Sequence, residues 1–262
     1  MAWDPAQYLK FESERARPFH DLVNRVDVDA PARVVDLGCG PGNATATLLD
    51  RWPTATVRGI DSSPEMVAKA SELAGPRLDF AVGVIEAWHP DGPVDVIVSN
   101  AALQWVPSHP GLLPRWMSVL TEGGALAFQV PSNVDSGAAE AFRAVATRPR
   151  WAGQLASVAA SWGPSQSGGV VRSGEEYVDL LAGAGHRVDA WQTTYFHVLP
   201  GEDPVLEWYS GTGLRPFLDA LAPGDHAEFG AEVAAALRDA FPPHDYGTVL
   251  PFRRLFVIAY RR

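Results

Sequence analysis

The stretch Val34-Val35-Asp36-Leu37-Gly38-Cys39-Gly40-Pro41-Gly42 decides the fold of this 262-residue chain. It begins as a short apolar run and passes through an acid into glycines at alternate positions. Such a run is typical of a buried strand, and glycine lets the chain turn sharply and lets its backbone approach a ligand without interference from a Cβ atom. We therefore predict a strand over residues 33–37, a tight loop, and a helix over residues 43–51.

The same alternation of strand and helix continues outward from this stretch. Further apolar runs predict strands at residues 56–60, 78–82, 94–98, 125–130, 188–197 and 253–260. Helices are expected at residues 112–120, at 174–182, and at 64–73 with Ser63 as the cap. Strands and helices at this spacing form βαβ units, whose right-handed crossovers give a parallel sheet covered on both faces. The predicted fold class is α/β.

Three segments do not follow this alternation. Residues 1–28 are expected to form an N-terminal helical cap of two short helices broken near Pro18. Residues 131–173 and 200–251 carry proline, glycine and aromatic residues beside short helical patterns, and each follows a strand. Ligands bind beyond the carboxyl ends of the strands in an open α/β sheet. We therefore interpret both as lid or substrate-pocket insertions in a single domain, residues 1–262.

Composition and charge exclude several classes of protein. The chain is 47% hydrophobic and 20% charged, the profile of a packed globular protein, and no apolar run approaches the roughly 18–20 residues of a membrane span. A formal net charge of −10 argues against general binding to nucleic acid or anionic lipid. A single cysteine and no clustered His and carboxylate spacing argue against an internal disulfide or a metal site. Without a recognisable secretion signal, the expected location is cytoplasmic.

The glycine loop distinguishes between nucleotide-binding folds. A dinucleotide site needs a third Gly or Ala three residues after the second glycine, and this chain has Asn43 there. Asp36 would repel a pyrophosphate and would attract an ammonium group instead. A nicotinamide-dependent dehydrogenase is therefore disfavoured.

This loop resembles the first motif of the class I S-adenosylmethionine-dependent methyltransferases. Their pattern, an acid followed by Gly-x-Gly-x-Gly, is matched by Asp36, Gly38, Gly40 and Gly42. The resemblance implies a Rossmann-like sheet of seven strands, mostly parallel with the last strand antiparallel, and S-adenosylmethionine as cofactor. Asp36, Gly38 and Gly40 are its expected first contacts.

The resemblance also implies cofactor contacts after the second and fourth strands. Asp61, with Ser62 beside it, stands at a strand end about 20 residues beyond the loop and is expected to bind both ribose hydroxyls. Asn100, at the end of the fourth strand, is expected to face the methionine part of the cofactor. The alternative for Asn100 is an amide that only caps the turn.

The adenine contact departs from the family pattern. Val84 stands where the family has an acid that meets the adenine amino group. Two arrangements are open: Glu86 replaces that acid, or Val84 and Ile85 enclose the ring and the backbone bonds to it.

Motifs outside the cofactor core are similar to one family, the trans-aconitate methyltransferases. They are Trp3-Asp4-Pro5, Tyr8-Leu9, Ser13-Glu14-Arg15-Ala16-Arg17-Pro18, Ala101-Ala102-Leu103-Gln104-Trp105, Trp191-Gln192-Thr193-Thr194-Tyr195, Gly211-Thr212-Gly213-Leu214-Arg215-Pro216 and Arg254-Leu255-Phe256-Val257-Ile258-Ala259. This family makes a monomethyl ester of trans-aconitate, a small tricarboxylate. Because a carboxylate is already ionised at neutral pH, the chemistry needs cationic clamps and no general base.

The resemblance implies that donors in several segments hold this trianion. We expect Arg15 and Arg17 from the N-terminal helix, Tyr195 and His197 from the late strand, and Arg215 from the second insertion. One N-terminal arginine is alternatively the partner of the cofactor's carboxylate. Solvated arginines and a half-buried sheet face are the structural alternatives for these residues.

Trp105, just past the fourth strand, is expected to wall the methyl channel or to anchor the following helix. The leading prediction is an O-methyltransferase acting on a carboxylate of trans-aconitate, with positioning residues only and no nucleic-acid or membrane partner. One alternative is a same-fold enzyme acting on a phenol or quinone precursor, with a base in place of the arginines. The other is a non-catalytic protein that binds S-adenosylmethionine.

Overall fold

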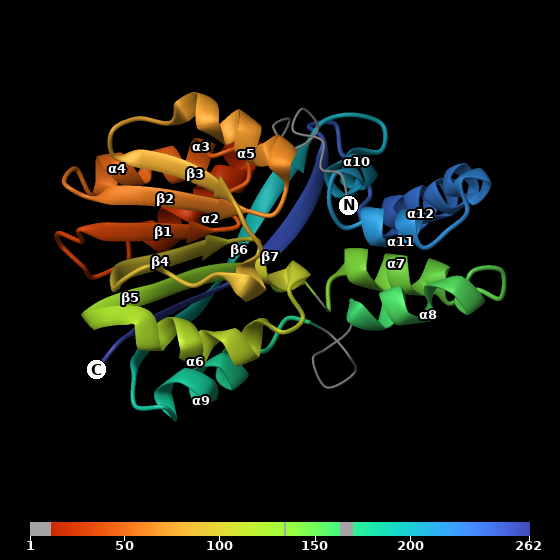
Figure 1. Cartoon of the computed structure of the whole chain (residues 1–262). Helices are drawn as coiled ribbons and strands as arrows, with labels where there is room; N and C mark the ends of the chain where they lie inside the picture. The colour runs from red at the N-terminus through yellow and green to blue at the C-terminus, as the bar shows by residue number, and fades with distance from the viewer. Residues whose placement is uncertain (1–11, 134, 163–169) are drawn as a thin grey trace. The chain divides into compact units, whose positions relative to one another are not determined.

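The computed structural model describes residues 12–133, 135–162 and 170–262, with only the backbone described for residues 12–15. Its framework is a seven-stranded sheet in the order β3-β2-β1-β4-β5-β7-β6 (Figure 1). The strands are β1 (Arg33–Leu37), β2 (Thr56–Asp61), β3 (Leu78–Val82), β4 (Val94–Asn100), β5 (Leu120–Pro131), β6 (Arg187–Leu199) and β7 (Thr248–Tyr260). The predicted α/β class and the predicted strands are confirmed.

The sheet is mostly parallel, with β7 running against its neighbour β5. β1 pairs in parallel with β2 and β4, and β2–β3 and β4–β5 are also parallel. At the start of β5, the Arg261 amide donates to the Gly124 carbonyl at 2.9 Å, just past the end of β7. Beyond the end of β5, the Ser132 amide donates to the Arg253 carbonyl, near the start of β7. These contacts run in opposite directions along the two strands, so the predicted antiparallel last strand is confirmed.

The described chain divides into two compact units. The first unit comprises the described residues up to Pro131, together with Ser173–Gln192 and Leu255–Arg262. The second unit comprises the described residues of Ser132–Arg172 and Thr193–Arg254. The second unit therefore contains nearly all of the two predicted insertions, together with parts of β6 and β7. The role of these insertions as a lid, and the description of residues 1–262 as one domain, stay predictions.

Helices of the first unit cover the sheet. They are α2 (Glu12–Val23), α3 (Asn43–Ala46), α4 (Leu48–Arg51), α5 (Pro64–Ala70), α6 (His109–Val119) and α9 (Gly174–Ala182), with short 3-10 turns at Ser71–Leu73, Ile85–Ala87 and Leu103–Trp105. Val96, Ile97 and Val98 of the central strand β4 are fully buried, as expected for a parallel strand covered on both faces. The core of this unit thus fixes the strand ends from which the site is built.

The predicted start of α5 is confirmed in detail. The Ser63 hydroxyl accepts a hydrogen bond from the Met66 amide at 3.2 Å, and Pro64 occupies the first turn. Proline suits this position because the first amides of a helix have no partner inside it. The loop between β2 and α5 is therefore held firmly beside Asp61.

Two helix predictions need correction. α2 is continuous from Glu12 to Val23 with Pro18 inside it, so the break predicted near Pro18 is wrong. Phe19 and Leu22 on this helix are fully buried, and their packing outweighs the backbone hydrogen bond that proline removes. The single helix predicted over residues 43–51 is two short helices, α3 and α4, joined at Thr47. The Trp3-Asp4-Pro5 motif and the first turns of the predicted cap lie outside the described residues.

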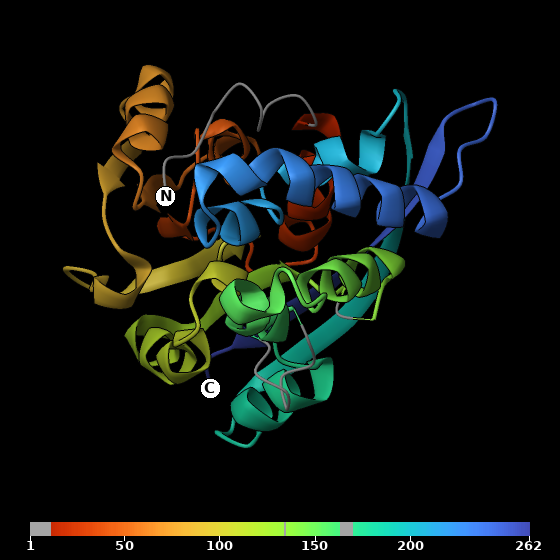
Figure 2. The ribbon, with the colours of Figure 1, turned by 90° about the vertical axis from the view of Figure 1, so that its right-hand side faces the viewer.

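The second unit is helical around the ends of its strands. It contains α7 (Gly137–Ala146), α8 (Ala152–Ser161), α10 (Pro204–Ser210), α11 (Arg215–Asp219) and α12 (His226–Ala240), with a 3-10 turn at Pro223–Asp225. α12 lies alongside α7 (Figure 2). Phe142, Phe217 and Phe229 are fully buried, with ring centroids 5.2 Å apart for the first pair and 5.8 Å for the second. Aromatic packing thus forms the core of this unit.

No helix in the described parts of the chain has the length and apolar character to cross a membrane.

Candidate functional site

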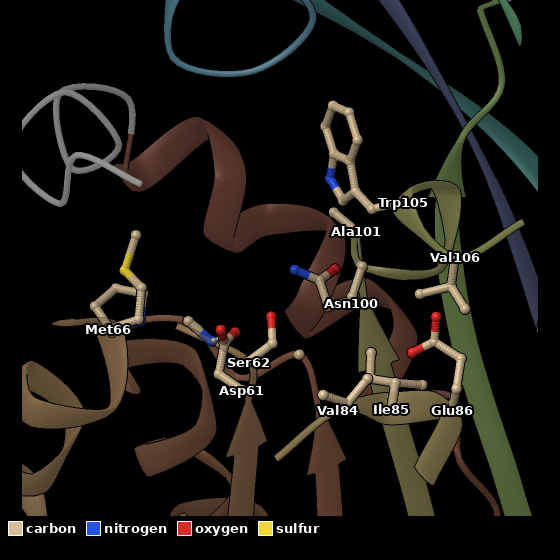
Figure 3. A pocket seen from close by; sticks show the side chains of 14 residues that line it. Asp61, Ser62, Met66, Val84, Ile85, Glu86, Asn100, Ala101, Trp105 and Val106 are labelled. Carbon is tan, nitrogen blue, oxygen red and sulfur yellow. Dashed lines mark hydrogen bonds between the residues drawn. The ribbon is translucent and has the colours of Figure 1, made fainter. Parts of the chain in front are cut away.

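A pocket of about 280 Å³ lies in the first unit, beyond the carboxyl ends of β1, β2, β3 and β4 (Figure 3). Four loops line it, through Gly38, Gly40 and Pro41; Asp61, Ser62 and Met66; Val84, Ile85 and Glu86; and Asn100, Ala101, Ala102, Trp105 and Val106. Parallel strands bring their carboxyl ends to one edge of the sheet, so residues distant in sequence meet there. Every cofactor contact predicted from the sequence lies in this lining except Asp36.

The glycine loop forms one wall of the pocket because side chains would not fit it. Gly38 has φ +84°, and a Cβ atom there would lie 2.3 Å from the Cβ of Ala102. Gly40 has φ +54°, and no atom of the described residues lies within 4 Å of the position its Cβ would take. The loop therefore packs closely against the strand β4 exit at Gly38 and leaves its backbone accessible at Gly40.

Asp61 ties two loops of the pocket together. Its Oδ2 accepts a hydrogen bond from the Gly40 amide at 2.9 Å, and its Oδ1 accepts one from the Ser63 amide at 2.9 Å. A carboxylate has about four acceptor positions, so each oxygen can still accept from a ligand. In Figure 3 the Asp61 carboxylate and the Ser62 hydroxyl point toward the same space as the Asn100 side chain.

Asp36 lies at the end of β1 and is only 2% exposed. Its Oδ2 accepts a hydrogen bond from the Thr45 hydroxyl at 2.6 Å, while its Oδ1 is buried and has no hydrogen-bond partner among the described residues. The pKa of Asp36 is raised to about 7, chiefly by burial; the Thr45 hydrogen bond opposes this rise and the negative charge of nearby Asp61 adds to it. A buried acceptor without a donor is unusual in a folded protein, and here it leaves an acid that a cation would satisfy. The predicted ammonium contact of Asp36 stays a prediction.

The loop after β4 adopts a conformation that few residues take. Ala101 has φ +53°, the one non-glycine residue with positive φ in the described chain. Its amide donates to the Gln129 carbonyl at 3.0 Å, and its carbonyl accepts from Nε2 of Gln104 at 2.5 Å. Strained backbone of this kind persists only where neighbouring groups hold it. Trp105, in the following turn, lines the pocket, and its role as a channel wall stays a prediction.

The residues considered for adenine recognition lie together. Val84, Ile85 and Glu86 all line the pocket; Val84 is 53% exposed and Ile85 only 8%. The Glu86 backbone carbonyl accepts a hydrogen bond from Arg115 at 2.7 Å, which fixes this turn. Both predicted arrangements, a Glu86 contact and an apolar enclosure, remain predictions.

Some lining residues were not expected from the sequence. They are Pro41, Met66, Ala101, Ala102 and Val106. Met66 carried a usable signal, because it stands in the first turn of the helix that follows Asp61. The two alanines carried none, since their place in the lining depends on how the β4 exit packs against Gly38.

The predicted substrate residues are divided between the units. Arg17 is exposed on α2 of the first unit, and Arg15 lies on the same helix, where only its backbone is described. Tyr195 and His197 belong to the second unit and are 2% and 8% exposed. Their rings stack with centroids 6.2 Å apart, as expected for alternate residues on one face of a strand. Arg215 is half-buried at the start of α11 in the same unit.

Buried polar side chains gather around His197 in the second unit. Its ring stacks on Trp208 with centroids 4.7 Å apart. Arg254, only 5% exposed, places its guanidinium 4.6 Å from the centroid of Phe252. Burial raises the pKa of Tyr209, and the positive charge of Arg254 opposes this rise. The sequence showed Arg254 only as part of a motif, because nothing local distinguishes a buried arginine from an exposed one.

Comparison with known proteins identifies the family. A family model described as a methyltransferase domain matches residues 34–124. Trans-aconitate 2-methyltransferase of Streptomyces avermitilis is 48% identical over 267 aligned residues, covering 99% of this chain and 97% of the relative. This chain belongs to the trans-aconitate 2-methyltransferase family. Members from Rhodococcus jostii and Mycobacterium tuberculosis are 48% and 45% identical over 98% of this chain, and the alignments cover 98% and 96% of those proteins. The predicted family and enzyme class are confirmed.

Solved structures agree with the fold of this family. The YcgJ protein of Bacillus subtilis superposes with a TM-score of 0.59 at 15% identity, covering 94% of this chain and 98% of that one. A putative methyltransferase of Bacillus halodurans gives a TM-score of 0.57 at 11% identity, with 94% and 99% covered. These similarities support the predicted Rossmann-like methyltransferase fold.

Proposed function

We propose that this chain transfers a methyl group from S-adenosylmethionine to a carboxylate of trans-aconitate and forms a monomethyl ester. The observation that carries the proposal is the 48% identity, over 99% of the chain, to a protein named trans-aconitate 2-methyltransferase. The pocket at the strand ends of the first unit supports the cofactor part of the proposal.

The pocket residues fit a cofactor that joins a nucleoside to a positive charge. Asp61 offers acceptor positions on both oxygens, which suits two ribose hydroxyls. Gly40 leaves room for a ligand, and Asp36, which is buried near the pocket without lining it, supplies an acid whose Oδ1 has no donor among the described residues. When bound, S-adenosylmethionine supplies an electrophilic methyl group on its sulfonium.

The proposed reaction asks for positioning rather than proton transfer. The carboxylate oxygen forms the new bond to the methyl carbon while the sulfur keeps the electron pair of the bond that breaks. Because the acceptor is ionised at neutral pH, no base is needed.

The proposal assigns the substrate's carboxylates to cationic and phenolic donors. Tyr195, His197 and Arg215 of the second unit, with Arg15 and Arg17 of α2, are the residues proposed to bind them. Arginine suits this role because its planar guanidinium binds carboxylates through two parallel hydrogen bonds.

An activity assay with a panel of acceptors tests the proposed function. The purified chain is incubated with S-adenosylmethionine and, separately, trans-aconitate, cis-aconitate, isocitrate, citrate and a set of phenols, and esters are detected by mass spectrometry. We expect the highest kcat/KM for trans-aconitate. Activity on phenols alone would replace this proposal with the same-fold alternative. Cofactor binding without turnover on any acceptor would favour a non-catalytic protein.

We also propose a cytoplasmic location and a small-molecule substrate as the main partner. The single cysteine supports the location, and the net charge of −10 argues against nucleic acid or anionic lipid as the partner. Fractionation of cells that express the tagged chain tests the location, and recovery in the membrane or secreted fraction would contradict it.

A further inference from the structure

Gln129 is a polar residue in an otherwise apolar strand. It lies in β5 within a run whose neighbours Phe128 and Val130 are fully buried, and it is itself fully buried. Burying an amide among apolar side chains is costly unless its groups form hydrogen bonds. The position therefore has a partner that justifies a glutamine, and the register of the sheet points to it: Gln129 is paired with Asn100 on β4.

The two side chains are joined directly at the edge of the pocket. Nε2 of Gln129 donates to Oδ1 of Asn100 at 2.6 Å. A side-chain amide carries an acceptor and a donor group on opposite sides, so binding the oxygen on one side fixes where the NH₂ group lies. Asn100 lines the pocket, and in Figure 3 its nitrogen points toward the side where Asp61 and Ser62 lie.

The same residue also holds the backbone that follows. The Gln129 carbonyl accepts from the amide of Ala101, whose φ is +53°. Gln129 thus restrains both the side chain of Asn100 and the strained turn after it. Among the lining side chains, Asp61 and Glu86 offer only acceptors when ionised, so the Asn100 amide adds a donor of fixed direction.

We propose that Gln129 is a positioning residue that fixes the Asn100 amide with its NH₂ group toward the pocket, where it donates to an acceptor atom of the bound cofactor. The inference deepens the proposed function, because it takes S-adenosylmethionine as the ligand. Gln129 does not touch the cofactor; it acts through Asn100.

A double-mutant cycle tests this coupling. Gln129→Met removes the hydrogen bond and keeps the side-chain length, and Asn100→Ala removes the group that it positions. Titration calorimetry with S-adenosylmethionine gives Kd for both single variants, the double variant and the parent. We expect Gln129→Met to raise Kd about 3- to 10-fold in the parent and less than about 2-fold in the Asn100→Ala background.

Gln129→Glu sharpens the test when it is measured at a pH above the pKa of the introduced carboxyl, which burial raises, because an ionised carboxylate has no donor. It would draw the Asn100 NH₂ group toward β5 and turn its oxygen to the pocket, so Kd is expected to rise at least as far as in Gln129→Met. The KM for trans-aconitate is expected to change less than the KM for the cofactor. A merely structural role would not separate these two constants.

Thr121→Val is the matched control. The Thr121 hydroxyl donates to Oδ1 of Asp95 at 2.8 Å and links the same two strands at the end away from the pocket. This variant is expected to lower the melting temperature without changing Kd. An unchanged Kd in Gln129→Met, or an equal loss in the Asn100→Ala background, would overturn the inference. Normal cofactor binding without methylation of trans-aconitate would instead overturn the proposed function and leave this inference standing.

Discussion

The two compact units hold their polar side chains in different ways. In the first unit, Asp61 and Asn100 stand at strand ends, line a pocket, and are bonded to neighbours on adjacent strands and loops. In the second unit, Tyr195, His197 and Arg254 are buried among aromatic rings. The first arrangement follows from parallel strands ending at one edge, and the second from packing between segments distant in sequence. The recognisable motif therefore belongs to the first unit, while the substrate assignments depend on the second.

A side chain added at Gly38 is expected to disturb the pocket of the first unit more than any other substitution considered. In Gly38→Ala the new Cβ atom would lie 2.3 Å from that of Ala102, in a backbone conformation that only glycine adopts easily. We expect cofactor affinity to fall by about 100-fold or more, measured by calorimetry, with a lower melting temperature.

A helix glycine of the second unit is the control. In Gly230→Ala, within α12, the added Cβ meets nothing within 4 Å, so we expect stability to rise by up to about 1 kcal/mol. Normal cofactor binding by Gly38→Ala would show that the close approach of the two loops is not needed.

The buried acid of the first unit predicts a pH dependence. The pKa of Asp36 is about 7 in the folded state, against an ordinary value of 3.8. Between pH 3.8 and pH 7 the folded protein therefore holds a proton on Asp36 that the unfolded chain has lost. The stability that Asp36 contributes is thus present below pH 3.8 and is lost as the pH rises through 7. Asp36→Asn is expected to be more stable than the parent above pH 7, on the order of a few kcal/mol at about 1.4 kcal/mol per pKa unit.

Denaturant unfolding of the cofactor-free protein from pH 5 to pH 8 measures this difference, which is expected to shrink toward the acidic end. Asp95 provides a comparison of opposite sign. Burial raises its pKa, but hydrogen bonds from the Arg33 amide, the Thr121 hydroxyl and the Ala32 amide outweigh this, so the pKa of Asp95 is lowered. Asp95→Asn is therefore expected to destabilise the protein at neutral pH. A pH-independent gain in Asp36→Asn would contradict the assigned titration.

Asp61→Asn tests whether the pocket of the first unit acts on the cofactor alone. The substitution removes the charge and turns one acceptor into a donor that faces a backbone amide. We expect Kd for S-adenosylmethionine to rise about 10- to 100-fold and the KM for trans-aconitate to stay within about 2-fold. Asp79→Asn is the control. Asp79 lies on β3 and forms an exposed ion pair with Arg58, so this substitution is expected to change neither the Kd nor the KM.

Arg215→Ala tests whether the second unit acts on the substrate alone. No hydrogen bond or ion pair of the Arg215 side chain occurs within the described residues. We expect the KM for trans-aconitate to rise about 10-fold with cofactor affinity unchanged. Arg238→Ala, which removes an exposed pair with Asp203 in the same unit, should leave both constants unchanged. An unchanged KM in Arg215→Ala would remove this residue from the substrate assignment.

Sequence patterns predicted the strands and most of the pocket because their causes are local. Apolar runs mark buried strands, and an acid or an asparagine after such a run must lie at the same sheet edge as its counterparts. Asp61 and Asn100 follow such runs, whereas Ile85 and Glu86 were predicted from the family resemblance. The break at Pro18 was wrongly predicted because helix propensity is weak beside the packing of Phe19 and Leu22.

What the sequence by itself determined is the order of strands and helices, the glycine loop and the family. Only the tertiary structure decided that Asp36 is buried with one oxygen that no described residue bonds to, that Gln129 faces Asn100, and that His197 stacks on Trp208. Turn chemistry and hydrophobic periodicity act over a few residues, so they can be read along the chain. The partner of a buried polar group is chosen by strand register and by packing between distant segments, which no local pattern records.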